Sequence, residues 1–164
     1  MTMKAPIPDK LHVAIAADHN GVAMKTRLIE FLAGLGHSYV DLGTNGPEVV
    51  DYPLLCLAVC REVTSGRAQR GIVIGGSGLG ETIACNKIRG IRAGLCRTAF
   101  DVEISRGNNN SNVLVLAAKV ISNEIAEQLT KAWLTHPFNG GVHQQRLDQI
   151  ARLEEGLDLF RSPN

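Results

Sequence analysis

The chain has 164 residues, the usual size of one domain, and can bury a hydrophobic core without disulfides or structural metal. Its 17 lysines and arginines against 16 aspartates and glutamates leave a net charge of +1, which argues against nucleic acid or a membrane surface as partner. No apolar run approaches the roughly 18 residues that span a bilayer, and the first ten residues lack the apolar core of a secretory signal.

Short apolar runs alternate with helical patterns along the chain. We expect strands at 11–18, 38–43, 71–76, 91–96 and 113–119. We expect helices at 21–35, from Pro53, from the glycine loop after residue 75, and at 98–106, 122–135 and 143–159. The apolar runs are nearly continuous, as in parallel strands that are covered on both faces.

This alternation predicts an α/β fold. We expect one doubly wound, Rossmann-like domain at 11–160, with a five-stranded, mostly parallel sheet, helices on both faces and an extra C-terminal helix. Residues 1–10 and the last four are expected to be loose.

The four cysteines indicate a reducing compartment. Cys56 and Cys60 are four residues apart, which matches neither a redox pair nor a zinc site. Together with Cys85 and Cys96 they stand in apolar segments, so we expect buried free thiols and a cytoplasmic protein.

Polar groups follow several of the expected strands. The first strand ends in Asp18, His19 and Asn20, the second in Gly43-Thr44, and the third in the glycine loop. Ligands of such sheets bind beyond the carboxyl ends of the strands, where the strand order reverses. We therefore expect these groups to share one rim.

The glycine loop, within "GIVIGGSGLGETIA" at 71–84, has the glycine spacing of a triphosphate-binding loop, but Glu81 stands where that loop needs lysine. The dinucleotide spacing Gly-x-Gly-x-x-Gly is absent. The loop can still present several N–H groups to an anion at the start of a helix. The carboxylate of Glu81 would repel triphosphate, which is therefore a poor candidate ligand.

A carboxylate at position 81 is explained if Glu81 acts chemically on a substrate. An ionised carboxylate beside convergent N–H donors is a base beside an oxyanion site, which suits proton abstraction next to a carbonyl. The alternative is that Glu81 only complements the helix dipole and the glycines only make a turn. Asp18 and His19 form a plausible substrate clamp, but Asp18 could equally cap the following helix.

Other polar stretches have structural explanations as their default. "SRGNNNSN" at 105–112 reads as a turn, and "HQQR" at 143–146 as a solvated helix start. Arg89 and Arg92 receive no role. No cluster of histidine, cysteine and acidic residues has metal-ligand spacing, and no ordered base and acid supports Ser77 as a nucleophile.

Taken together, these motifs resemble the type B ribose-5-phosphate isomerases and the related galactose-6-phosphate isomerase subunits. The resemblance covers about 11–155 and includes, besides the stretches above, "DYP" at 51–53, "NK" at 86–87 and "GIRA" at 90–93. It implies interconversion of aldose and ketose sugar phosphates through a cis-enediolate, without metal or cofactor. It also implies homodimers, or dimers of dimers, with shared active sites, and no nucleic acid or membrane partner.

The resemblance also implies roles for individual residues. Glu81 is the base, Ser77 a supporting hydroxyl, and Asn108 occupies the place of the family's ring-opening histidine. In one branch of the family the base is instead a cysteine at the position of Gly75, which excludes that branch here. The implied substrate-binding residues are Asp18, His19, Tyr52, Gly76, Ser77, Gly78, Leu79, Gly80, Asn109, Lys119, His143 and Arg146. Arg146 would bind phosphate in the neighbouring subunit's site.

Departures from the family pattern leave the substrate open. Besides Asn108, Val142 and Lys119 stand where the family has arginines. Ribose 5-phosphate and ribulose 5-phosphate are the default pair. The alternatives are erythrose 4-phosphate, a six-carbon sugar phosphate or, in another class, a sugar-phosphate-binding protein without catalysis.

Overall fold

The computed structural model describes residues 9–160, and most of the segments expected to be loose lie outside this range. The strands are β1 (His12–Ala17), β2 (Ser38–Asp41), β3 (Arg70–Gly75), β4 (Ala93–Leu95) and β5 (Val113–Ala117). The helices are α1 (Val22–Gly34), α2 (Tyr52–Thr64), α3 (Leu79–Asn86), α4 (Ala99–Glu103), α5 (Asn123–Thr135) and α6 (Val142–Glu154). A π-helical turn, η1 (Ile104–Asn108), follows α4 directly.

The sheet has the strand order β2-β1-β3-β5-β4, and each neighbouring pair is parallel. The predicted doubly wound α/β fold is therefore confirmed. From β1 the chain moves outward to β2 and then returns to β3 on the other side of β1. The strand order thus reverses between β1 and β3, and the loops after these two strands lie at the point where such folds bind ligands.

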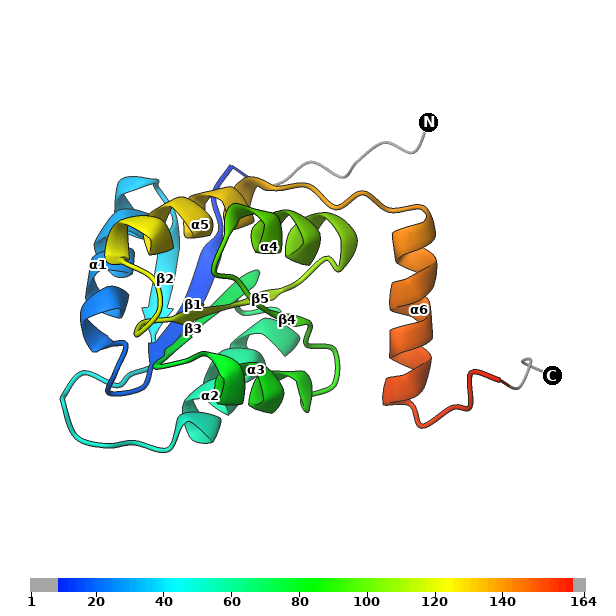
Figure 1. The fold of residues 1–164 in the computed structure, drawn as a ribbon, viewed down its shortest axis with the longest axis horizontal. Coiled ribbons are helices and arrows are strands. Elements are labelled where there is room, and N and C mark those ends of the chain that lie inside the picture. The colour runs from blue at the N-terminus through cyan, green and yellow to red at the C-terminus, as the bar shows by residue number, and fades with distance from the viewer. Residues whose placement is uncertain (1–8, 161–164) are drawn as a thin grey trace.

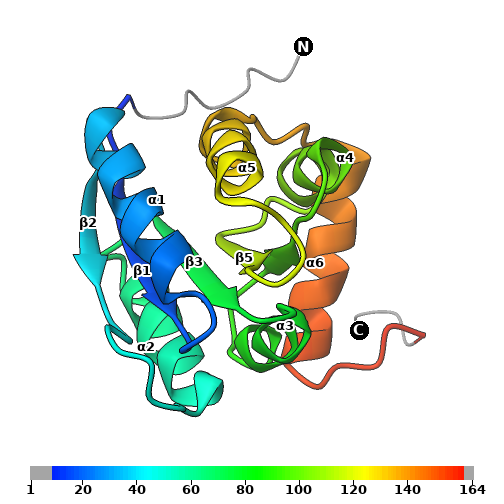
Figure 2. The same ribbon diagram turned by 60° about the vertical axis from the view of Figure 1, so that its left-hand side comes forward.

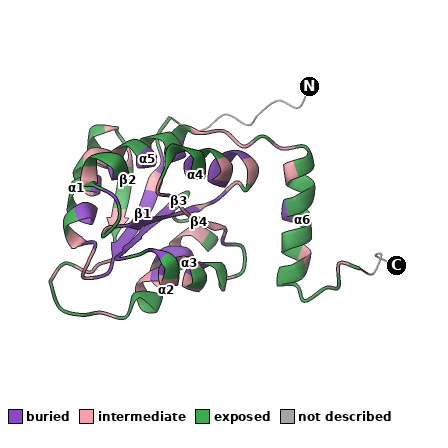
Figure 3. Cartoon of the chain, in the orientation of Figure 1, coloured by how far each residue is buried: buried purple, intermediate pink, exposed green. Residues whose placement is uncertain are grey.

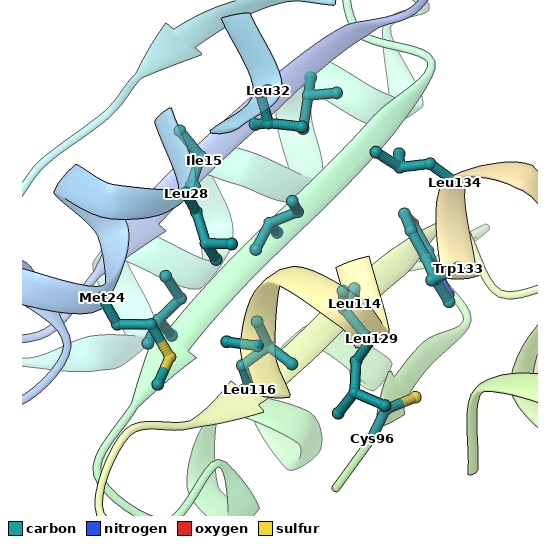
Figure 4. Packing of buried hydrophobic residues seen from close by; sticks show 14 of the residues in the cluster. Ile15, Met24, Leu28, Leu32, Cys96, Leu114, Leu116, Leu129, Trp133 and Leu134 are labelled. Carbon is teal, nitrogen blue, oxygen red and sulfur yellow. The ribbon is translucent and has the colours of Figure 1, made fainter. Parts of the chain in front are cut away.

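Two helical layers cover the sheet (Figures 1 and 2). Alternate strand residues face opposite layers, so Ile15 and Leu114 pack toward α1, α4 and α5, whereas Ala14 and Val115 pack toward α2 and α3. Figure 4 shows the first of these cores, in which Trp133 of α5 closes the side away from α1. The four cysteines are buried free thiols, as expected.

Helix α6 stands apart from these layers (Figure 1). Leu147 is its buried residue, and most of the helix is exposed (Figure 3). Polar contacts hold its two ends: Asn139 donates from its N–H to the carbonyl of Gly107 (2.9 Å), and Arg89 pairs with Glu155 (2.9 Å). No helix of the described residues is long and apolar enough to cross a membrane.

Two predicted helix boundaries were wrong. The helix expected at 98–106 divides into α4 and η1, and the wider turn of η1 carries Ser105 and Arg106 into the interior. The last helix ends at Glu154 rather than 159, because Gly156 takes a left-handed conformation (φ 74°) and the N–H of Leu157 returns to the carbonyl of Arg152 (3.0 Å).

Candidate active site

The predicted site residues fall into two groups at opposite ends of the sheet. The carboxyl-edge group follows β1, β3 and β5 or opens α2, and comprises Asp18, His19, Tyr52, Gly76, Ser77, Gly78, Leu79, Gly80, Glu81 and Lys119. The amino-edge group precedes β5 or opens α6, and comprises Asn108, Asn109, His143 and Arg146. Figures 1 and 2 show the start of α6 beside α4 and away from α3. A single chain therefore does not bring the two groups together.

The glycine loop turns sharply from β3 into α3. Gly78 has φ 75°, and a methyl group on it would lie 2.5 Å from the Leu95 side chain, so both conformation and space require glycine. The first helical hydrogen bond runs from Thr82 N–H to the Gly78 carbonyl (3.0 Å), and Leu79 N–H reaches Ser77 Oγ (3.3 Å). Among the described residues, the N–H groups of Gly76, Ser77, Gly78 and Gly80 meet no acceptor. These amides can receive an oxyanion.

Glu81 lies in the first turn of α3 and is 4% exposed. Its carboxylate occupies the space that a side chain on Gly75 would need, and no lysine, arginine or histidine of the described residues pairs with it. Burial raises the pKa of Glu81, its own backbone N–H opposes this effect, and the negative charge of Asp18 adds to it. A carboxylate that only complemented the helix dipole would not need burial, so this environment favours the base.

Asp18 is 6% exposed and does not cap α1, whose N-cap is Gly21 and receives no side-chain hydrogen bond. Instead Asp18 accepts from the backbone N–H (2.8 Å) and the side-chain amide (2.9 Å) of Asn20. The half-buried ring of His19 lies between this amide (3.3 Å) and the N–H of Val50 (3.5 Å). The helix-cap interpretation of Asp18 is therefore wrong.

Two further side chains border the glycine loop. The ring of Tyr52 lies against Gly80, where a methyl group would meet its hydroxyl at 2.6 Å. Lys119 donates its backbone N–H to the Gly76 carbonyl (3.0 Å), and its stem runs past Gly76. Sequence reasoning missed Arg97, which follows β4 and reaches the Ser77 carbonyl with Nη2 (3.5 Å). The only signal for Arg97 was its place after a strand.

The amino-edge group is organised by η1. Asn108 Oδ1 accepts from the Asn139 side chain (3.4 Å), which ties η1 to the segment that leads into α6. Arg92 Nε donates to the Asn109 carbonyl (3.2 Å). Asn109 is exposed and borders a cavity of about 680 Å³ between α6 and β4, the outermost strand of the sheet. Leu147 and other apolar residues of α6 line this cavity. None of the carboxyl-edge group lines this cavity.

The described residues contain no group of three or more histidine, cysteine or acidic side chains arranged to hold a metal ion. The carboxyl edge offers a buried carboxylate beside open backbone amides, with Asp18, His19 and Lys119 around them. This combination suits proton transfer next to a carbonyl whose oxygen becomes negatively charged.

Comparison with known proteins agrees with this chemistry. The model of the Ribose/Galactose Isomerase family matches residues 13–150. The chain belongs to this family. Ribose-5-phosphate isomerase B of Escherichia coli is 36% identical over 143 residues, which cover 87% of this chain and 96% of that protein. D-erythrulose-4-phosphate isomerase of Pectobacterium atrosepticum is 32% identical over 149 residues, which cover 88% and 95%.

The solved structure of Clostridium thermocellum ribose-5-phosphate isomerase B matches with a TM-score of 0.87 and 39% identity, and the match covers 88% of this chain and 98% of that one. The resemblance drawn from the motifs is thus confirmed. The protein is an enzyme of the aldose–ketose isomerase class within this family of sugar phosphate isomerases.

Proposed function

We propose that this isomerase interconverts ribose 5-phosphate and ribulose 5-phosphate by proton transfer at Glu81. The observation that carries the proposal is the buried carboxylate of Glu81 beside the open amides of the glycine loop. The E. coli relative named for this reaction supports the choice of substrate. We assign the catalytic domain to residues 11–160. The four buried free thiols suit a cytoplasmic enzyme.

In the proposed reaction, Glu81 removes the proton from C2 of the open-chain aldose. The carbonyl oxygen at C1 then carries the negative charge of an enediolate, which the amides of Gly76, Ser77, Gly78 and Gly80 stabilise. A proton passes between the two substrate oxygens, and Glu81 returns its proton to C1 to give the ketose. Asp18 and His19 hold substrate hydroxyls, and the Ser77 hydroxyl supports Glu81 or a substrate oxygen.

The test is a panel of aldose phosphates from four to six carbons, with unphosphorylated controls, assayed for ketose formation and for deuterium uptake from D₂O. Glu81→Gln keeps the shape of the side chain and removes the base, so kcat should fall by about 10²–10⁴ with substrate binding retained. Deuterium uptake distinguishes catalysis from binding alone. A Gln variant within about tenfold of wild type would mean that another residue is the base.

The active unit in this proposal is at least a homodimer with shared sites. Asn108, Asn109, His143 and Arg146 lie at the amino edge of the sheet, so a second copy must supply them to Glu81. Two apolar features support such a contact. On α3, Leu79 and Ile83 are 56% and 63% exposed, and the cavity beside Asn109 is open and largely apolar.

Subunit mixing tests the shared site. Glu81→Gln and Arg146→Ala affect opposite edges, so a hybrid dimer has one site with both native groups. After subunit exchange, an equal mixture should recover about a quarter of wild-type activity, because half the dimers are hybrids with one intact site each. The control mixes Glu81→Gln with Asp18→Asn, both at the carboxyl edge, and should recover nothing. Recovery in neither mixture after verified exchange argues against sharing.

Erythrose 4-phosphate is a second candidate substrate. Asn108 can hydrogen-bond a ring oxygen but cannot supply a proton at neutral pH, and a four-carbon aldose phosphorylated on its terminal oxygen cannot close a furanose ring. Val142 removes one positive charge from the expected phosphate site. The relative named D-erythrulose-4-phosphate isomerase supports this candidate. Asn108→His should then improve turnover of ribose 5-phosphate more than that of the four-carbon sugar. This idea predicts that wild type turns over ribose 5-phosphate poorly. A wild-type kcat/KM on ribose 5-phosphate above about 10⁴ M⁻¹s⁻¹, with no gain in Asn108→His, would refute it.

A further inference from the structure

Asn20 contacts more of the carboxyl-edge group than its place in a turn requires. Its backbone N–H donates to Asp18 Oδ1 (2.8 Å), and its side-chain Nδ2 donates to Asp18 Oδ2 (2.9 Å). The same Nδ2 lies 3.3 Å from Nε2 of His19. A methyl group on Gly76 would lie 3.2 Å from this Nδ2, so the amide also lies against the glycine loop. One side chain thus connects the polar residues after β1 with the loop after β3.

The side-chain amide is not needed to make the turn. The turn closes through the Asn20 backbone N–H on Asp18 and through the Gly21 N–H on the Asp18 carbonyl (3.0 Å). Nearly any residue at position 20 could supply that backbone group. The amide adds a donor to the second carboxylate oxygen, so both oxygens are held and the plane of the carboxylate is fixed.

We propose that Asn20 is a positioning residue, whose amide holds the Asp18 carboxylate and the His19 ring against the glycine loop so that both face the substrate of Glu81. The inference rests on the proposed function. It adds a residue to which the motifs gave no role, and it explains how a buried acid without a cationic partner keeps one orientation beside a second carboxylate.

The test compares Asn20→Ala and Asn20→Asp with wild type on ribose 5-phosphate and erythrose 4-phosphate, across pH. Asn20→Ala removes a hydrogen bond to a charged group, so kcat/KM should fall about tenfold or more. The acidic limb of the kcat/KM profile reports ionisation of Glu81 in the free enzyme. It should move to lower pH in Asn20→Ala, because an unheld Asp18 turns toward water and away from Glu81. It should move to higher pH in Asn20→Asp, because that variant adds a negative charge.

Shifts of opposite sign are a result that a purely structural role would not give. Besides Asp18, the ionisable groups at the same end of the sheet as Glu81 include His19 after β1, Lys119 after β5, Arg97 after β4, and Tyr52 and Cys56 on α2, and both variants leave them in place. The matched control is Asn123→Ala, a half-buried asparagine at the start of α5, which should leave kcat/KM and the pH profile unchanged.

The two proposals fail in different ways. If wild type is active and Glu81→Gln is not, but Asn20→Ala keeps kcat/KM within about twofold and an unmoved acidic limb, the role of Asn20 alone is overturned. A loss of activity in Asn20→Ala that merely parallels a lower melting temperature, with Asn20→Asp behaving as wild type, overturns it too. If wild type isomerises no sugar phosphate of the panel, the proposed function falls and this inference falls with it.

Discussion

Replacing Lys25 by methionine should destabilise the fold and loosen the rim of the site. Lys25 lies on α1 and is 1% exposed. Its ammonium donates to Asp41 Oδ1 (2.5 Å) at the end of β2 and to Asn45 Oδ1 (2.6 Å) in the following loop. That loop also places Val50 beside His19. One buried cation therefore fixes the segment that borders the candidate substrate site.

The magnitude follows from the burial of the two partners. Removing one member of a fully buried ion pair costs about 3–5 kcal/mol, because the other charge is left without compensation. The Asp41 side chain is 28% exposed and keeps a hydrogen bond from the Gly43 N–H (3.0 Å), so water and the backbone offset part of this cost. Methionine retains most of the buried stem. We therefore expect a loss of about 2–3 kcal/mol, or about 4–12 °C in Tm for a domain of this size.

Equilibrium unfolding in urea, at fixed protein concentration, measures this loss. The control is a double-mutant cycle with Asp41→Asn, in which the second substitution should cost much less once Lys25 is gone, because the two residues interact directly. The Michaelis constant should rise in Lys25→Met, since the loop that borders His19 is less ordered. A destabilisation below about 0.5 kcal/mol, the range of ordinary surface substitutions, would refute the reasoning.

Three further predictions concern the buried groups. Burial and Asp18 raise the pKa of Glu81 in the fold, so its protonated form adds stability at low pH that is lost as pH rises through the raised pKa. Glu81→Gln should hence melt above wild type at pH 7 and lose this advantage near about pH 4. Gly75→Ala should lower kcat about tenfold or more, because the methyl group displaces the Glu81 carboxylate; unchanged kcat would place the base elsewhere. Trp133→Phe removes the indole donor to Ser111 Oγ (2.8 Å) beside buried Arg106 and should cost about 1–3 kcal/mol in urea unfolding, whereas an unchanged midpoint would contradict it.

Local pattern was enough to predict the fold class. The apolar runs that form β1, β3 and β5 are nearly continuous. A strand with apolar side chains on both faces is typical of a parallel sheet that helices cover on both faces. The glycine loop was also predictable, because its conformation depends on glycines that the sequence shows directly. Helix ends were less predictable. Gly156 can end a helix, but the sequence does not say whether the helix will continue past it.

The arrangement of the site was harder to predict than its members. In a parallel sheet the loop before a strand lies at the amino end and the loop after it at the carboxyl end, whereas the pairing of β5 between β3 and β4 is a long-range choice that no local pattern records. Arg146 was expected to act in the neighbouring subunit's site, and the structure adds that Asn108 also lies at the end of the sheet opposite to Glu81. Asn20 was expected on the rim but received no role, because asparagine after a strand has an ordinary explanation in a turn and only the contacts of its amide distinguish it.

The position of Glu81 explains why the loop combines a carboxylate with a glycine at position 75. Its carboxylate fills the space beside Gly75 that any side chain there would need. The resemblance to the type B isomerases implies that, in one branch of the family, a cysteine base stands at this same position. The proposed base Glu81 and such a cysteine would occupy one volume at the end of β3, so a chain can hold one or the other. Glycine at 75 thus belongs to the proposed catalytic arrangement together with Glu81, because it leaves room for a carboxylate that approaches from the helix rather than a thiol that approaches from the strand.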